Sequence, residues 1–172
     1  MMARNVILTG FMGTGKTTVG LLLAERLGYG FVDTDGLIEE RYGRSIPDIF
    51  AELGEDAFRE MEGTVALELA GQGGLVISTG GRLMLDAVNA AELGRNGRVF
   101  CLTASPEEIL MRISADGGAE RPLLAGSDSA ERIAGLLAER REGYGQFEQV
   151  VTDGKTADEV VSVIVTLLGV GK

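Results

Sequence analysis

Short apolar runs alternate with longer amphipathic stretches along most of the 172-residue chain. One such stretch, residues 16–27, places apolar side chains at helical spacing after the first run. The apolar runs have the length of strands and lie at residues 5–9, 31–33, 75–78, 99–102 and 149–151. Because strands separated by helices pair in parallel through crossover connections, this order predicts an α/β fold with a five-stranded parallel sheet flanked by helices.

Three expected helices begin with a capping pattern, in which a hydroxyl side chain precedes a carboxylate by three residues. The pattern occurs at Ser45–Asp48, Ser105–Glu108 and Thr156–Glu159. Such a hydroxyl accepts a hydrogen bond from an otherwise unpaired N–H of the first helical turn, so we assign these residues to structure. No repeat, linker or low-complexity segment interrupts the chain, and residues 1–172 are expected to form a single domain.

Residues 10–17 read Gly-Phe-Met-Gly-Thr-Gly-Lys-Thr directly after the first apolar run, which is the P-loop pattern. Glycines let backbone N–H groups approach phosphate oxygens, the lysine adds positive charge, and the hydroxyl is a ligand for Mg²⁺. The alternative is a chance turn in a chain with 26 glycines, but lysine is scarce. The pattern therefore predicts an ATP site that contains Gly13, Thr14, Gly15, Lys16, Thr17 and Thr18.

Composition narrows the classes of function. The net charge of −10 and the isoelectric point near 4.5 argue against nucleic-acid binding, which requires clustered Lys and Arg. The apolar stretch Val160–Leu168 is too short to cross a bilayer, and we expect no cleavable signal. The single cysteine, Cys101, lies inside an apolar run and is expected to be buried rather than reactive. We expect a cytoplasmic monomer that binds neither nucleic acid nor membrane.

Two carboxylates follow the second apolar run, which ends at Asp33, with Asp35 two residues later. Since the carboxyl ends of parallel strands share one edge of a sheet, both are expected beside the P-loop. Asp33 is the candidate for holding Mg²⁺. The chain has no histidine, so a general base for a hydroxyl has to be a carboxylate, which favours Asp35. The alternative for Asp35 is an N-cap of a helix over residues 36–42.

Two arginines on expected helices have the setting of anion ligands. Arg140 falls on the apolar stripe of its helix and is expected to point inward, whereas Arg141 faces away. An inward arginine needs an anionic partner. Arg59 lies beside another apolar stripe, and its alternative is a surface ion pair with Glu55 and Glu62.

A third arginine, Arg121, lies in the segment 115–127, which is rich in glycine and polar residues and has little periodicity. Such a segment is typical of a mobile lid, and a lid arginine can neutralise charge on a phosphate during transfer. The alternative is a solvated loop arginine.

The turn Ser78–Gly81 follows a buried strand at the carboxyl edge of the expected sheet. Its two glycines, Gly80 and Gly81, would let a ligand approach the backbone. A tight loop without function is the alternative.

Six motifs, in order and at similar spacing, resemble the shikimate kinase family over nearly the whole chain. They are Gly10-Phe-Met-Gly-Thr-Gly-Lys-Thr-Thr-Val-Gly20, Phe31-Val-Asp-Thr-Asp35, Phe58-Arg59, Ser78-Thr-Gly-Gly81, Arg121-Pro-Leu-Leu-Ala-Gly126 and Ala138-Glu-Arg-Arg-x-x-Tyr144. The resemblance implies a three-layer P-loop kinase fold like that of the nucleoside-monophosphate kinases. It also implies transfer of the γ-phosphoryl group of ATP to the 3-hydroxyl of shikimate, in the biosynthesis of aromatic amino acids.

The resemblance assigns a role to each candidate residue. Lys16 and Thr17 would serve ATP and Mg²⁺, Asp33 would belong to the outer shell of the ion, and Arg121 would serve ATP from the lid. Lys16, Arg121 and Asp35 would be catalytic, with Asp35 acting on the reacting hydroxyl. Helices within residues 35–62 would bind the acceptor. The acceptor ligands would be Asp35, Arg59, Gly80, Gly81 and Arg140, the arginines through the substrate carboxylate and the glycines through backbone N–H groups.

The chain departs from the family pattern at two places. Arg82 stands where the family usually has a third glycine, and we expect its side chain to point out of the acceptor pocket because a third buried arginine would be costly to desolvate. Glu142 and Gly143 stand where the family usually has Pro-Leu, and a glycine there is expected to loosen the helix that carries Arg140.

Two rival functions stay open. One is a kinase for another small polyhydroxy acid such as gluconate, since inward arginines fit any carboxylate. The other is a non-catalytic nucleotide-binding regulator whose acceptor site has changed, which Arg82 favours and the five intact site residues disfavour. These residues are Asp33, Asp35, Arg59, Arg121 and Arg140.

Overall fold

Five strands form one sheet in the computed structural model, which describes residues 4–116 and 129–170. The strands are β1 (Asn5–Thr9), β2 (Gly30–Asp33), β3 (Leu75–Ser78), β4 (Gly97–Thr103) and β5 (Glu148–Val151). Their order across the sheet is β2-β3-β1-β4-β5, and each neighbouring pair is parallel. The predicted five-stranded parallel sheet is confirmed, with the predicted bounds for β1 and β3 and slightly longer strands elsewhere.

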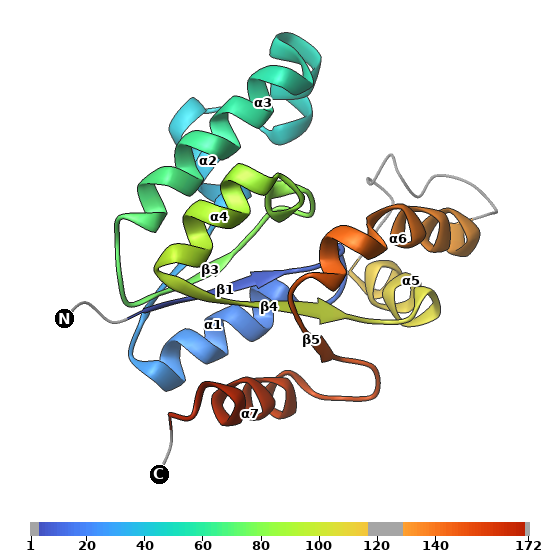
Figure 1. The fold of residues 1–172 in the computed structure, drawn as a ribbon. Helices are drawn as coiled ribbons and strands as arrows, with labels where there is room; N and C mark the ends of the chain where they lie inside the picture. The colour runs from blue at the N-terminus through green and yellow to red at the C-terminus, as the bar shows by residue number, and fades with distance from the viewer. Residues whose placement is uncertain (1–3, 117–128, 171–172) are drawn as a thin grey trace.

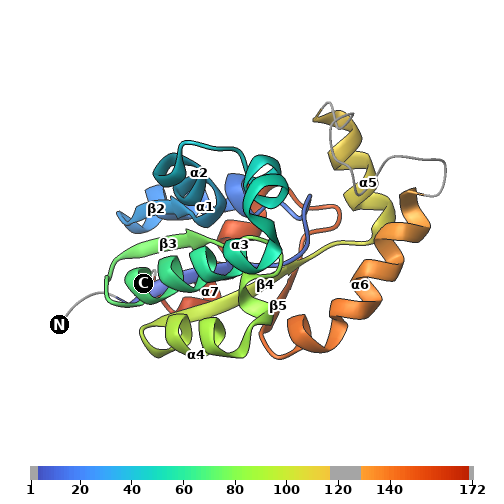
Figure 2. The same cartoon turned by 90° about the horizontal axis from the view of Figure 1, so that it is seen from above.

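Helices cover both faces of this sheet (Figure 1). The helices are α1 (Lys16–Leu27), α2 (Thr34–Tyr42), α3 (Ile46–Ala70), α4 (Ala87–Arg95), α5 (Pro106–Ala115), α6 (Ser129–Gly145) and α7 (Ala157–Leu168), with a 3₁₀ turn η1 (Leu83–Leu85). In Figure 1, α1 and α7 lie below the sheet and α3 and α4 lie above it. Figure 2 shows α5 and α6 together at one end, beyond the carboxyl end of β4. The predicted three-layer arrangement is therefore present.

The core divides where the strands alternate their side chains. Val6 and Leu8 of β1 pack into a cluster with α1 and α7, whereas Ile7 between them packs against α3 and α4. Both faces are buried, which explains why the strand sequences are continuously apolar. Cys101 is fully buried in a third cluster with α5 and α6, and burial raises its pKa to about 11. The expected burial of the cysteine is confirmed, and the raised pKa disfavours the reactive thiolate.

The three predicted helix caps are present. The side chains of Ser45, Ser105 and Thr156 each accept a hydrogen bond from the backbone N–H three residues later. The Glu159 carboxylate in turn accepts a hydrogen bond from the backbone N–H of Thr156, which completes a capping box. Each cap stabilises its helix by about 1 kcal/mol.

Parallel pairing brings three segments to one edge of the sheet. The P-loop follows β1, the two aspartates follow β2, and the Gly80–Gly81 turn follows β3. The expected lid falls almost entirely on residues 117–128, and Arg121 with it, so both lie outside the described residues. None of the described helices is long and apolar enough to cross a membrane.

Candidate active site

The P-loop has a backbone that only glycine adopts easily. Gly10, Gly13 and Gly15 have φ values of 133°, 74° and 94°. At Gly10 a Cβ would also lie 2.3 Å from the carbonyl oxygen of Leu102, so a side chain has no room. Lys16 folds back over this loop, and its Nζ donates to the carbonyl oxygens of Gly10 and Phe11 at 2.8 and 2.9 Å. The ammonium group is thereby held above the cradle formed by the glycines.

The N-terminus of α1 differs from those of its neighbours. Its N-cap Gly15 supplies no side-chain hydrogen bond, and its first turn contains no acidic residue. By contrast, α2, α3, α4, α5 and α7 each have a side-chain cap. Backbone N–H groups and the positive end of the helix dipole at α1 are therefore left to attract an anion. Thr17 and Thr18 are exposed in this first turn.

The start of α2 corrects one interpretation of the aspartates. The helix begins at Thr34 rather than at residue 36, and its N-cap is Asp33, whose Oδ1 accepts from Gly36 N–H at 2.9 Å. The alternative of Asp35 as the N-cap is therefore wrong. Asp35 lies in the first turn of α2.

Asp35 has the electrostatic setting of a proton acceptor. Its pKa is raised to about 6, mainly by burial and then by the negative charges of Asp33 and Glu62, while Lys16 opposes the shift. Its Oδ1 is buried and has no hydrogen-bond partner among the described residues. A buried acceptor without a donor is costly, so this oxygen is positioned for a donor that the described residues do not supply.

The β3–η1 turn makes room for that carboxylate. A Cβ on Gly80 would lie 2.6 Å from Asp35 Oδ1, which excludes a side chain there while Asp35 keeps its position. The Gly80 amide donates to Thr34 Oγ1 at 2.9 Å. This bond corrects the expectation that both glycine amides are available, because the Gly80 N–H already has a partner. Gly81 accepts a hydrogen bond from the Tyr144 hydroxyl through its carbonyl oxygen.

Arg140 and Arg141 face opposite ways, as expected. Arg140 is half-buried, its guanidinium carbon lies 5.2 Å from the centre of the Phe11 ring, and a Cβ on Gly81 would be 3.3 Å from its Nη1. Arg141 is exposed. The structure thus brings Arg140 from α6 to the glycine turn of β3, next to the P-loop residue Phe11.

Arg59 forms both ion pairs that were the alternative to ligand binding. The pair with Glu55 is exposed, whereas the pair with Glu62 is partly buried. Its guanidinium donates to Glu55 Oε1 at 3.0 Å and to Glu62 Oε2 at 2.6 Å. Glu62 is only 2% exposed, and burial raises its pKa although Arg59 opposes the shift. The Arg59 guanidinium also lies 5.2 Å from the Phe58 ring centre. These contacts fix the arginine in one position.

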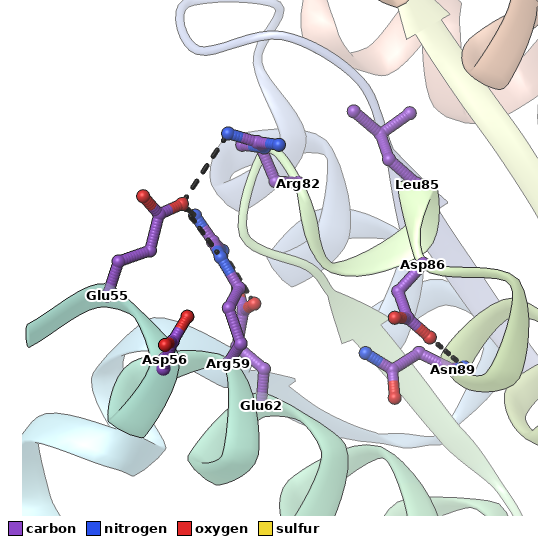
Figure 3. A pocket seen from close by; sticks show the side chains of 8 residues that line it. All are labelled: Glu55, Asp56, Arg59, Glu62, Arg82, Leu85, Asp86 and Asn89. Atoms are coloured by element: carbon purple, nitrogen blue, oxygen red, sulfur yellow. Dashed lines mark hydrogen bonds and ion pairs between the residues drawn. The ribbon is translucent and has the colours of Figure 1, made fainter.

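A hollow of about 310 Å³ adjoins this site between α3 and the η1–α4 segment (Figure 3). It is lined by Glu55, Asp56, Arg59, Glu62, Arg82, Leu85, Asp86 and Asn89. Asp35, Gly80, Gly81 and Arg140 do not line it, so it shares Arg59 with the acceptor side without being the whole site. The Arg82 side chain is 56% exposed and turns toward Glu55, with Nη1 3.5 Å from Oε1. Arg82 is therefore not a third buried cation.

Two structural residues at the site were not recognised from the sequence. Arg112 on α5 donates to Gly13 O, to Thr152 Oγ1 and to Thr152 O at 3.4, 2.9 and 3.0 Å, which ties the P-loop to the segment after β5. The only sequence signal was its spacing of four from Glu108, which indicates no more than a helix-surface pair. Thr34, whose Oγ1 accepts the hydrogen bond from the Gly80 N–H, belongs to no sequence pattern that indicates this contact.

Gly143 has a packing role that the sequence did not indicate. Helix α6 continues through it to Gly145, and a Cβ on Gly143 would lie 2.6 Å from Leu85 Cδ2. The glycine thus allows α6 to approach η1 closely, and the expected loosening of the helix stays a prediction.

The P-loop lies near a carboxylate whose Oδ1 has no hydrogen-bond partner among the described residues, and arginines from two helices lie on the same side of the sheet. This arrangement defines a P-loop kinase that acts on a small molecule. The chain belongs to the shikimate kinase family, whose family model matches residues 12–168. It is 46% identical over 166 residues to a shikimate kinase of Geobacter sulfurreducens, covering 96% of this chain and 91% of the relative. It is 47% identical over 164 residues to one of Thermus thermophilus, covering 95% and 89%.

Solved structures agree with this assignment. A shikimate kinase from Acinetobacter baumannii in complex with shikimate has a TM-score of 0.87 and 36% identity, covering 96% of this chain and 93% of that one. A gluconokinase from Sinorhizobium meliloti has a TM-score of 0.62 at 17% identity, with coverage of 98% and 93%, so it shares the fold alone. The predicted family, fold class and kinase class are confirmed.

Proposed function

We propose that this chain phosphorylates the 3-hydroxyl of shikimate with ATP, giving shikimate 3-phosphate for aromatic amino acid biosynthesis. The observation that carries the proposal is the buried Asp35 Oδ1, which has no donor among the described residues. The positive charge of the P-loop Lys16 acts on the same carboxyl group. Family membership supports both the kinase reaction and the acceptor.

On the nucleotide side, the glycine-rich loop and the uncapped start of α1 bind the phosphates, and Lys16 adds a point charge. Thr14, Gly15 and Thr18 belong to the same cradle. The Thr14 hydroxyl donates to Phe11 O at 2.7 Å, which fixes the loop before any ligand arrives. Little reorganisation is then needed when charge develops on the transferring group.

The donors present fit Mg²⁺. Thr17 offers an exposed hydroxyl beside the cradle, and Asp33 keeps one carboxylate oxygen while the other caps α2. Mg²⁺ prefers a few protein oxygens together with waters and substrate phosphates. Thr17 would bind it directly and Asp33 through water. When bound, the ion supplies charge neutralisation on the phosphate oxygens.

On the acceptor side, Arg59 and Arg140 bind the substrate carboxylate, and the Gly81 amide and the Gly80 backbone border the ring. The 3-hydroxyl donates its hydrogen to Asp35 Oδ1 and is aligned with the γ-phosphorus. As the new O–P bond forms, the bond to the β-phosphate oxygen breaks and the proton passes to Asp35. With a pKa of about 6, the carboxylate is ionised at pH 7 and ready to accept it.

The remaining parts of the proposal rest on the sequence. Residues 1–172 act as a single domain, helices within residues 35–62 bind the acceptor, and residues 115–127 act as a lid that brings Arg121 to ATP. The monomeric state, the cytoplasmic location and the lack of nucleic-acid or membrane partners also stay predictions.

A substrate panel tests the proposed function. ATP consumption is followed with shikimate, with gluconate and without an acceptor, and the product is identified by phosphorus NMR. We expect turnover with shikimate only, and phosphate on the 3-oxygen. Preference for gluconate would establish the rival kinase, and ATP binding without turnover on either acid would establish the regulator.

A further inference from the structure

Three cationic nitrogens converge on one oxygen of Glu55 at the edge of the hollow (Figure 3). Nε and Nη2 of Arg59 lie 3.3 and 3.0 Å from Glu55 Oε1, and Nη1 of Arg82 lies 3.5 Å from the same atom. Arg59 and Glu55 belong to α3, whereas Arg82 comes from the turn after β3. The shared carboxylate therefore links the acceptor helix to the segment that follows the glycine turn.

The geometry leaves part of Arg59 available. Of its five N–H groups, those on Nε and Nη2 that point to Glu55 and one on Nη1 that points to Glu62 are used among the described residues. One N–H on each terminal nitrogen is left. A bidentate contact with a carboxylate through the two terminal nitrogens uses one N–H on each of them.

Charge balance decides whether these N–H groups attract an acid. Arg59 stands between two carboxylates, Glu55 and Glu62, so without further cations the cluster carries a net negative charge. Arg82 adds the positive charge that offsets one of them. Arg59, and to a smaller extent Arg82, lower the pKa of Glu55, which favours its ionised form.

We propose that Arg82 is a positioning residue for the acceptor carboxylate. By sharing Glu55, it holds that side chain on the Nε side of Arg59 and neutralises it, so that the terminal N–H groups of Arg59 face the substrate. The proposal rests on the proposed function in requiring an acidic acceptor. Arg82, which stands where the family usually has a third glycine, thus increases the affinity for the substrate instead of blocking the pocket.

The test compares Arg82→Gly with Arg82→Lys and with Arg44→Gly, a matched control whose arginine also pairs from a turn with a glutamate of α3, Glu52, outside the hollow. We expect Arg82→Gly to raise KM for shikimate about threefold with kcat and KM for ATP unchanged, the size of an exposed ion pair. Lysine should restore KM because the contact is a single nitrogen, and high salt should shrink the difference.

A double-mutant cycle tests whether Arg82 acts on KM through Glu55. In a Glu55→Gln background, Arg82→Gly should change KM by less than about 1.5-fold. An unchanged KM in Arg82→Gly alone, a fall in KM, or the same rise in both backgrounds would each overturn the proposal. Shikimate binding is measured by calorimetry in parallel. Binding without turnover by the wild type refutes the proposed function but leaves the Kd ratios to judge Arg82, and no binding refutes both.

Discussion

The nucleotide side and the acceptor side of the site are built in different ways. Residues 10–18 supply the whole P-loop and the start of α1 as one continuous segment. The acceptor side instead combines the first turn of α2, the middle of α3, the turn after β3 and the last turns of α6. Local sequence dictates the first through glycine backbone angles, whereas the second exists only once the sheet order and the helix packing are complete.

The two sides also differ in charge. The cradle at α1 has no acid in its first turn, so it presents positive potential to phosphates. The acceptor side mixes acids with arginines, and each arginine is held by neighbours: Arg59 by two glutamates and Arg140 by the Phe11 ring. Substitutions on the nucleotide side should therefore abolish turnover without a change in stability. Those on the acceptor side should change substrate affinity, kcat or stability, depending on the residue.

The largest effect is expected for Lys16→Ala. Turnover should fall by at least about thousandfold, because a preorganised charge on the transferring phosphate is lost. The fold should stay intact, since the Lys16 side chain is not part of the buried apolar core and its ammonium donates to the loop carbonyls of Gly10 and Phe11. A coupled assay and circular dichroism measure both quantities. Lys155→Ala, at an exposed turn residue, is the control, and near-normal turnover in Lys16→Ala would exclude the kinase assignment.

Asp35→Asn comes next. We expect kcat to fall by about a hundredfold or more, with nucleotide affinity almost unchanged, because only proton transfer from the acceptor is removed. In the wild type, kcat/KM should decline as the pH falls through about 6, where the carboxylate becomes protonated. If Asp35→Asn kept its kcat and lost affinity for ATP, Asp35 would belong to the nucleotide side of the site.

The same substitution has a stability signature. A carboxyl group whose pKa is raised from 3.8 to about 6 favours the protonated form in the folded state, so it lowers stability as the pH rises through this window. Asp35→Asn should therefore be more stable than the wild type at pH 8, by about 1–2 kcal/mol after allowing for partial solvent exposure, and equal to it near pH 4. Urea unfolding at both pH values measures the difference. Lower stability of Asp35→Asn than of the wild type at pH 8 would show that the charged Asp35 does not destabilise the folded state.

Arg140→Ala and Arg141→Ala form a matched pair on adjacent positions. Loss of a partly desolvated cation that holds a carboxylate should cost about 2 kcal/mol or more, which is roughly a thirtyfold rise in KM for shikimate. The exposed Arg141 should contribute little. Michaelis constants for both substrates measure this contrast, and equal effects from the two variants would refute the facing of α6.

The success of the sequence predictions also differs between local patterns and contacts that join distant segments. The five strands, the helix over residues 16–27 and the three caps are local patterns, and they hold in the structure. The helix start at Thr34 was missed because Asp33 and Asp35 are both good N-caps, and a shift of two residues separates a capping role from a catalytic one.

Contacts between distant segments lay beyond the sequence patterns. Nothing in the turn after β3 indicates that Thr34, far earlier in the chain, takes the Gly80 amide. The meeting of Arg82 with Glu55 likewise depends on where α3 kinks at Gly54, whose φ is 85°. Hydrophobic periodicity locates the faces of elements, but not which polar groups meet across them.

The smallest effect concerns the packing that seats α6 on the acceptor side. Gly135 and Gly143 lie in the same helix, and a Cβ on Gly135 would meet nothing within 4 Å, whereas one on Gly143 would lie 2.6 Å from Leu85 Cδ2. Gly135→Ala should stabilise the protein by about 0.5–1 kcal/mol through helix propensity alone. Gly143→Ala gains the same propensity but forces the end of Leu85 to move, so its net change should lie near zero or below.

Urea unfolding of the two alanine variants gives this difference directly, and the KM for shikimate of Gly143→Ala shows whether the displaced Leu85, which lines the hollow, reaches the substrate. Equal stabilisation by both alanines would mean that α6 does not need its close approach to η1. The acceptor side would then tolerate a looser assembly than its four separate segments imply.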